Sequence, residues 1–476
     1  MTYTPPCAPT APTLSPTPWR TEFRQLFKLA IPIVATQVAW VAMLTTDTAF
    51  IGRLGSDALA GAGLSLMTFF IGYMLCFGVT MSTAGLAAQA FGARRPRIVR
   101  RVIRQGLWVG GMMIAPCVLG FTFTGPLLAA LDQPPEALPH AEAYMSTLMW
   151  SLPPAIAFAI LRNFVSALGR PGPALYAMAA GVPVNALLDY VLIFGNFGFP
   201  RLELVGAGIA TSTVNVLMLA FIAAVAQWRR PFNKYQVFAR FWRPDWKIFV
   251  EILRVGTPIS VMMVLEGGFF IGAVFVIGQF GAVAVAAHMI AMQMPHITFM
   301  VPMGMSQAAT VRVGQMAGRR DVTGAYRAGW AALAVTAAFM LVTTTVILAT
   351  TGPFARLFMD TDTAGADLVL PMAQGLLILA ALFQLGDGIQ AVAAGALRGV
   401  NDTKIPMINA VASFWGLGAT LALWLAFHRG LETEGIWVGF VVSLCIAALL
   451  QTWRFRCLQR RAYLPELLEE EKAPTA

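Results

Sequence analysis

Charged side chains are scarce in this sequence, where they make up 12% of 476 residues. Soluble domains carry about 25% charged residues, so a single soluble globular domain is excluded. Cysteine and histidine are also scarce, with five and four residues. Because the cysteines lack metal-ligand spacing, we expect no disulfide and no metal site; they are Cys7, Cys76, Cys117, Cys445 and Cys457.

Motifs for nucleotide binding and hydrolysis are missing as well. The sequence contains no G-x-x-x-x-G-K-[ST] phosphate loop, no H-E-x-x-H zinc motif and no G-x-S-x-G nucleophile turn. We therefore expect a protein that is not an enzyme and that uses no cofactor. No ATP-binding subunit is implied, so the energy for any transport has to come from an ion gradient or a partner.

Apolar residues are abundant, at 58% of the chain, and the mean hydropathy is +0.69. A helix needs about 20 apolar residues to cross a bilayer. Stretches of this kind predict an all-α polytopic membrane protein with twelve spans, near 29–52, 60–91, 103–131, 141–168, 174–195, 205–228, 249–280, 283–317, 325–351, 366–397, 405–427 and 434–456.

The net charge of +10 is distributed unevenly between the two sides of the membrane. Only Arg53, Arg201, Arg356 and Arg429 fall in the loops after spans 1, 5, 9 and 11. All other Lys and Arg lie in or beside the termini and the alternate loops, which the positive-inside rule places in the cytoplasm. We expect a cytoplasmic (inner) membrane protein with both termini inside, and no nucleic-acid partner.

The two halves of the chain repeat one another. With Pro32 aligned to Pro258, residues 32–94 match 258–320 without a gap, and the identical pairs include Gly52/Gly278, Gly78/Gly304, Gln89/Gln315 and Gly92/Gly318. Six spans per half give parallel repeats, which predict two lobes around a cleft that opens alternately to either side.

These boundaries define five segments. We expect a disordered cytoplasmic tail at 1–24, an N-lobe of spans 1–6 at 25–228 and a cytoplasmic linker at 229–247. A C-lobe of spans 7–12 follows at 248–457, and a cytoplasmic tail at 458–476.

Four acidic residues fall inside predicted spans, at Asp47, Asp189, Glu266 and Asp387. An acid at the bilayer centre costs roughly 2.5–3.5 kcal/mol, so such residues usually face a cavity and function there. Asn185 stands one helical turn before Asp189, on the same face. Asp47, Asn185 and Asp189, with Thr211 on span 6, could form an oxygen-rich pocket in the N-lobe, and Glu266 and Asp387 its counterpart in the C-lobe.

Such carboxylates suit a coupling ion. A carboxyl removed from water can take up and release protons near neutral pH, while neighbouring oxygen ligands favour Na⁺ instead. No intramembrane Lys or Arg is an obvious partner for these acids, and Arg162 is the nearest candidate. Negative charge in a cleft favours small organic cations. Candidate cavity-lining residues are Trp40, Phe269, Met292 and Phe383, and Pro32 is a candidate hinge in span 1.

Several stretches resemble the MATE (multidrug and toxic compound extrusion) family in its NorM-like branch. They are DTAFIGRLGSDALAGAGLS (47–65), VPVNALLDYVLIFG (182–195), GAGIATSTV (206–214), AVAAHMIAMQM (284–294) and GDGIQAVAAGALRGVNDTK (386–404). The resemblance implies twelve helices in two lobes and an antiporter that exports cationic amphiphilic compounds in exchange for H⁺ or Na⁺. We expect the protein to function as a monomer.

The resemblance also assigns roles to individual positions. Asp47, Asn185, Asp189 and Thr211 match the family's N-lobe cation cluster, and Glu266 and Asp387 match the C-lobe acids of the NorM-like branch. Phe383 stands where NorM-like members can carry a tyrosine, so a hydroxyl ligand is missing there.

Two other transporter classes share the twelve-span pattern. A major-facilitator exporter usually has an Asp near the Arg cluster between spans 2 and 3, and GARRPRIVRR has none. A lipid-linked oligosaccharide flippase of the same superfamily is the closer alternative, but clefts that bind phosphates tend to carry several cationic residues.

Overall fold

The computed structural model describes residues 18–358 and 366–466, and within them it is built from helices. Twelve helices or helix pairs are long and apolar enough to span a membrane, as the sequence predicts. The N-lobe holds α1 (Trp19–Ile51), α2 (Ser56–Gly92), α3 (Pro96–Phe121), α4 (Thr124–Ala130), α5 (Leu138–Leu148), α6 (Leu152–Ala167), α7 (Gly172–Phe194) and α8 (Glu203–Trp228).

The C-lobe contains the remaining helices. They are α9 (Trp246–Gly278), α10 (Ala282–Thr298), α11 (Met300–Gly318), α12 (Val322–Phe358), α13 (Ala366–Gly399), α14 (Lys404–Val411), α15 (Ala419–Leu423) and α16 (Glu432–Arg460). Span 8 combines α10 and α11, which a break at Phe299 separates between Pro295 and Pro302. Span 11 includes two π-helical segments, 412–418 and 424–428, beside α14 and α15.

The expected segment boundaries differ slightly from the observed helix ends. α1 begins at Trp19, inside the stretch 1–24 that we expected to be a tail, and α16 continues past 457 to Arg460. Apolar pattern alone cannot place these ends, because the terminal turns of both helices carry polar residues. Residues 1–17, which include Cys7, and residues 467–476 lie outside the described residues.

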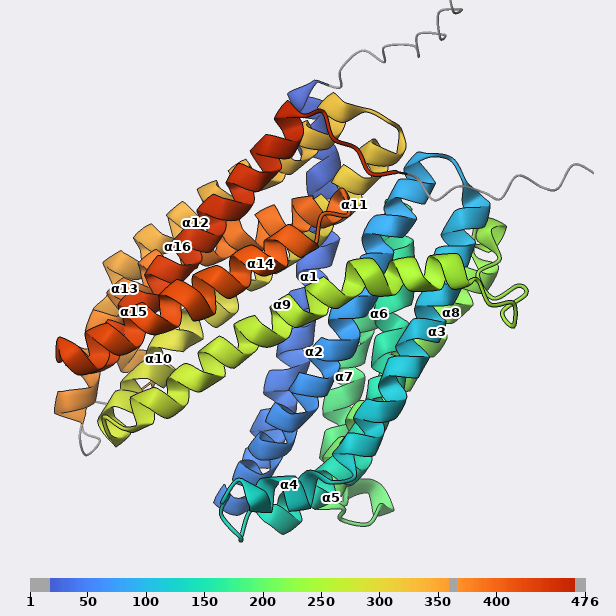
Figure 1. The fold of residues 1–476 in the computed structure, drawn as a ribbon. Coiled ribbons are helices and arrows are strands. Elements are labelled where there is room, and N and C mark those ends of the chain that lie inside the picture. The colour runs from blue at the N-terminus through green and yellow to red at the C-terminus, as the bar shows by residue number, and fades with distance from the viewer. Residues whose placement is uncertain (1–17, 359–365, 467–476) are drawn as a thin grey trace, which may run out of the picture.

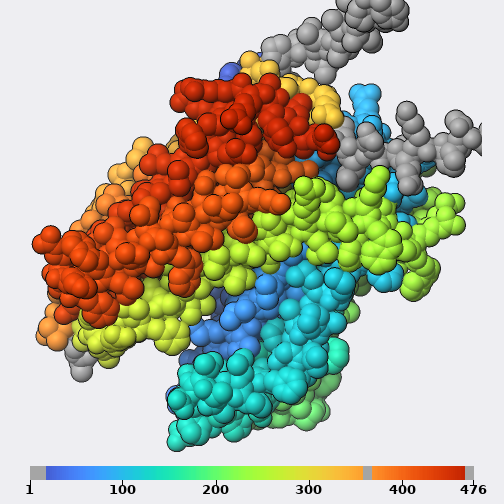
Figure 2. Space-filling view, viewed as in Figure 1, coloured from blue at the N-terminus to red at the C-terminus, as the bar shows by residue number. Residues whose placement is uncertain are grey.

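The two lobes meet at one end and separate towards the other (Figure 1). From one side, the space-filling surface is recessed between α9 and α3, and blue residues of the N-lobe form the floor of the recess (Figure 2). Both described ends of the chain lie at the joined end, where Tyr326 donates a hydrogen bond to the Tyr463 carbonyl and Arg327 stacks over Trp19. A chain with an even number of spans has both ends on the same side of the membrane, so the two ends are expected to lie together.

Four glycines allow the lobes to approach closely, and they form mirrored pairs. A Cβ on Gly92 would lie 2.0 Å from the Gln315 carbonyl oxygen, and one on Gly318 would lie 2.0 Å from that of Gln89. The repeat equates Gly92 with Gly318 and Gln89 with Gln315. The second pair is Gly78 against Ser260 and Gly304 against Val34, positions that the same alignment exchanges.

Side-chain hydrogen bonds strengthen this contact in the same mirrored way. Gln89 donates to the Gly399 carbonyl at the end of α13, at 2.8 Å. Gln315 donates to the Ala167 carbonyl at the end of α6, at 2.9 Å. Each glutamine therefore satisfies a carbonyl at a helix end in the opposite lobe, where the helix itself offers no partner.

A buried ion pair also joins the lobes at this end. Arg312 on α11 makes a two-pronged contact with Glu22 on α1, at 2.9 and 3.0 Å, and also donates to Gln315 at 3.2 Å. The two charged side chains are 5% and 0% exposed. Arg312 lies inside a predicted span, and its acidic partner is Glu22 in the first turn of α1, which is not one of the four acids that the sequence places within spans.

Candidate functional site

Three helices of the N-lobe bring together the four polar residues expected to form one pocket. Asp47 comes from α1, Asn185 and Asp189 from α7, and Thr211 from α8. Asn185 and Asp189 are one turn apart on the face of α7 that packs against α1, so both reach Asp47. Asp47 is 4% exposed, and Asn185 and Asp189 are fully buried.

Asn185 is at the centre of the hydrogen-bond network. Its amide nitrogen donates to Asp47 Oδ1 and, at 2.7 Å, to Asp189 Oδ2. The Thr211 hydroxyl lies 3.3 Å from Asp47 Oδ2 and 3.1 Å from the Ala207 carbonyl, and its single proton can serve only one of them at a time.

Two oxygen atoms of this cluster are buried without a hydrogen-bond partner among the described residues: Asn185 Oδ1 and Asp189 Oδ1. Asp47 and Asp189 also lie close enough for their charges to act on each other. Two carboxylates in this position resist simultaneous ionisation unless a cation lies between them. The cluster can therefore hold a proton or a cation such as Na⁺, and the two unpartnered oxygens are suitable ligands for either.

The cluster borders a cavity of about 160 Å³. Asp47 and Thr211 line it, whereas Asn185 and Asp189 lie behind them. Its walls are mainly aromatic and methionine side chains, as suits an apolar or amphiphilic guest. The aromatic members are Trp40, Phe69, Phe70, Tyr73, Phe77, Tyr144 and Phe158, and Met263 and Met303 come from the C-lobe.

An arginine also lines this cavity, away from the acids. Arg162 is 8% exposed, donates to Gln37 Oε1 at 3.2 Å and stacks over Phe77 at 5.7 Å. None of the ion pairs found in the described part of the chain includes it. Gln37 and Asp47 share α1 and are ten residues apart, so about 15 Å of helix separates the two levels of charge.

The C-lobe acids do not form a matching hydrogen-bonded cluster. Glu266 on α9 is half-buried and Asp387 on α13 is 7% exposed, and their charges act on each other. The charge of Arg398, on α13, also acts on Glu266. Arg398 donates to Ser306 at 2.8 Å and to the Ala394 carbonyl. The sequence interpretation missed Arg398 because it ended span 10 at residue 397.

Only one of the four expected lining residues borders the cavity described above. Trp40 does so. Phe269 and Phe383 instead pack in the C-lobe core at 5% and 2% exposure, each against Phe440, and Met292 packs against the same core. An aromatic residue in a uniformly apolar helix has no sequence signal that distinguishes a core position from a cavity wall.

Pro32, the expected hinge, lies inside α1, which continues as one helix from Trp19 to Ile51. Its ring removes one backbone hydrogen bond from the helix. Thr36, one turn later, donates its hydroxyl to the Pro32 carbonyl at 2.8 Å. The helix is therefore weakened at Pro32, between its packed first turns and the level of Asp47.

Comparison with known proteins addresses the identity of this two-lobe fold. The family model described as MatE matches residues 32–191 and 258–424, one segment in each lobe. The chain belongs to the MATE family. Members of this family are multi-pass membrane transporters and not enzymes, which agrees with the expectation from the sequence.

Named relatives place it in the NorM-like branch of MATE proteins. A probable multidrug resistance protein NorM of Rhodopseudomonas palustris is 45% identical over 93% of this chain and 94% of its own length. A protein of the same name from Bradyrhizobium diazoefficiens is 40% identical over 92% and 94%. The crystal structure of the eukaryotic MATE transporter AtDTX14 matches with a TM-score of 0.84, covering 93% of this chain and 98% of that one, at 19% identity.

Proposed function

We propose that this MATE protein is a secondary antiporter that exports cationic amphiphilic compounds in exchange for H⁺ or Na⁺. The observation that carries the proposal is the Asp47–Asn185–Asp189–Thr211 cluster, with two unpartnered buried oxygens, at the wall of an aromatic cavity. The names of the NorM relatives, which refer to multidrug resistance, support the export of several compounds.

Asp47 is the residue through which ion and substrate compete. It is the member of the acidic pair that lines the cavity, so a substrate cation can reach it while Asp189 stays behind. A proton or Na⁺ bound between the two carboxylates neutralises Asp47 and weakens its attraction for that cation. Loss of the ion restores the attraction, so binding of the ion and binding of the substrate oppose each other, as exchange in an antiporter requires.

The direction follows from the expected topology. The joined end carries the termini and the linker, which the distribution of Lys and Arg places in the cytoplasm. In that orientation the lobes are open towards the outside, ready to release substrate and to admit the ion. Export then requires the reverse arrangement, in which the contacts around Gly92 and Gly318 separate.

A gradient experiment tests the proposal. Purified protein in liposomes is given a pH gradient or a Na⁺ gradient separately, and movement of ethidium is followed for wild type, Asp47→Asn and Asp189→Asn. We expect one or both gradients to drive wild-type transport and both variants to lose it. Asp57→Asn is the matched control, since Asp57 is an exposed acid of the same lobe. Equal transport by all four proteins would refute the role of the cluster.

The flippase alternative gains one observation from the structure. Arg162 lines the cavity with no acidic partner among the residues described, so an anionic group could bind there. Asp47 on the same cavity wall disfavours a phosphate, because it adds a like charge at the other level. Movement of fluorescent lipid-linked phosphates in the same liposomes would favour this second function over export of cations.

A further inference from the structure

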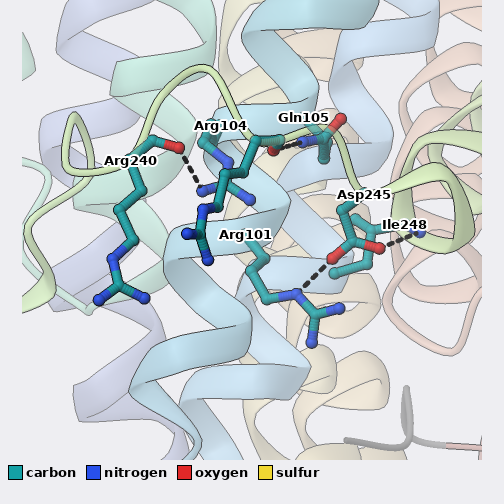
Figure 3. A network of polar contacts seen from close by, with 7 residues as sticks. Arg101, Arg104, Gln105, Arg240, Asp245 and Ile248 are labelled. Carbon is teal, nitrogen blue, oxygen red and sulfur yellow. Dashed lines mark hydrogen bonds and ion pairs between the residues drawn. The ribbon is translucent and has the colours of Figure 1, made fainter. Parts of the chain in front are cut away.

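Five arginines gather where the linker between the lobes crosses the end of α3. Arg100, Arg101 and Arg104 belong to α3, and Arg240 and Arg243 belong to the linker. In Figure 3 the linker passes beside α3, and Arg101, Arg104 and Gln105 extend from α3 towards it. This arginine cluster is far from the acidic site and has no part in the transport mechanism proposed above.

The linker is held by hydrogen bonds to its backbone and not to its arginine side chains. Arg104 donates to the Arg240 carbonyl at 2.8 Å, Gln105 to the Arg243 carbonyl at 3.4 Å, and Trp108 to the Phe241 carbonyl at 3.1 Å. These contacts fix the path of the linker but leave the positive charges of Arg240 and Arg243 unneutralised.

One acid compensates the cluster. Asp245 pairs with Arg101 and also accepts the Ile248 backbone N–H, at 3.4 Å, as the N-cap of α9 (Figure 3). Among these six residues positive charges outnumber negative ones by four, although Arg240 meets Arg104 through its carbonyl and extends its side chain away from α3 (Figure 3). Arg104 lies near enough to Arg100, Arg101 and Arg243 for their like charges to repel it.

Two of these guanidinium groups also have buried atoms without a partner. Nε of Arg100 and Nε of Arg104 are both inaccessible and make no hydrogen bond within the described ranges. A buried donor without an acceptor costs about 1–3 kcal/mol, and a charged group costs more. An anion bound to the accessible guanidinium nitrogens of the cluster would relieve the repulsion and offset part of this cost.

The surroundings of the cluster are those of a membrane surface. Trp242 and Trp246 in the same segment are 81% and 67% exposed, and Trp228 at the end of α8 is 78% exposed. Tryptophan is enriched at the level of lipid headgroups, where its ring is apolar and its N–H is wet. Anionic lipids are concentrated on the cytoplasmic leaflet, the side on which the charge distribution places this linker.

We propose that the arginine cluster binds the phosphate of an anionic phospholipid headgroup. The phosphate would bridge α3 to the linker and so stabilise the segment that leads from the N-lobe into the first turn of α9. Charge-assisted hydrogen bonds between arginine and phosphate provide the affinity, and the exposed tryptophans contact the glycerol and upper acyl region.

Two linker substitutions test the proposal without disturbing the fold. Arg240→Gln and Arg243→Gln remove exposed side-chain charges and keep the backbone carbonyls that hold the linker. The matched control is Arg456→Gln with Arg460→Gln, which removes two exposed charges from α16 on the same side of the membrane.

Native mass spectrometry of the full chain in detergent, titrated with phosphatidylglycerol or phosphatidylcholine, measures lipid retention. We expect wild type and the control to prefer phosphatidylglycerol, and the linker variant to bind it about 25-fold more weakly, since each arginine near a lipid surface contributes a roughly fivefold gain.

Equal retention of phosphatidylglycerol by the linker variant and the control would overturn the proposal. Displacement of the lipid by millimolar inorganic phosphate would also overturn it, because the site would then be one for a free anion. Transport of ethidium plays no part in this measurement, so its result is independent of the antiport proposal.

Discussion

The buried pair between Glu22 and Arg312 should control how often the two lobes separate at the joined end. Glu22→Gln keeps the size of the side chain and removes its charge, leaving the Arg312 guanidinium 5% exposed and without its carboxylate. Removing one partner of a buried ion pair costs about 3–5 kcal/mol. The cost applies only while the lobes are joined, because separation exposes Arg312 to water.

The population of the two conformations should shift accordingly. A change of about 3 kcal/mol alters a two-state equilibrium roughly 150-fold, which turns a minor state of about 1% into the majority. In the proposed orientation, Glu22→Gln favours the form that is open to the cytoplasm and closed to the outside. Removing both charges, in Glu22→Gln with Arg312→Gln, should shift the equilibrium less than Glu22→Gln alone.

Spin labels at the outer end can measure this shift. Ser56 and Ala282 begin α2 and α10, are exposed, and are equivalent in the repeat, so cysteines there report the distance between the lobes in a background without native cysteines. We expect Glu22→Gln to add a population with a shorter distance. Glu203→Gln is the control, because its pair with Arg201 is 52% and 61% exposed. Identical distance distributions for the two variants would refute the reasoning.

Three further predictions concern packing, the C-lobe and topology. Gly92→Ala should lower the melting temperature or hold the lobes apart, since its Cβ would lie 2.0 Å from a carbonyl oxygen, whereas Gly111→Ala, with open space around it, should do neither. Glu266→Gln and Asp387→Asn should fold normally but export ethidium more slowly; wild-type rates in both at equal expression would remove the C-lobe acids from the mechanism. Cys457 should react with an impermeant thiol reagent in inverted vesicles and be protected in intact cells, and labelling from outside would reverse the orientation.

The sequence was sufficient for the architecture and for one of the two polar sites. Twelve apolar runs predict the spans because a bilayer demands a fixed length, and the repeat predicts the two lobes. The N-lobe cluster was also predictable, since the spacing of Asn185 and Asp189 places them on one face and few other polar groups in those spans compete for them.

Contacts between distant segments were not predictable in this way. Glu22 and Arg312 are 290 residues apart, and no local pattern links them. Arg398 was missed through a span boundary that was one residue short. Phe269 and Phe383 were assigned to a cavity wall because a helix that is apolar on all sides gives no indication of which face meets the core, the lipid or a cleft.

The mirrored contacts of Gly92 and Gly318 give the joined end the form of a homodimer interface within a single chain. A surface that contacts its own equivalent through a twofold axis is isologous, and here each lobe contributes a glycine and a glutamine to two matching contacts. The two lobes can therefore differ in their polar sites, whereas α2 and α11 both need a residue without a Cβ at the position where they meet.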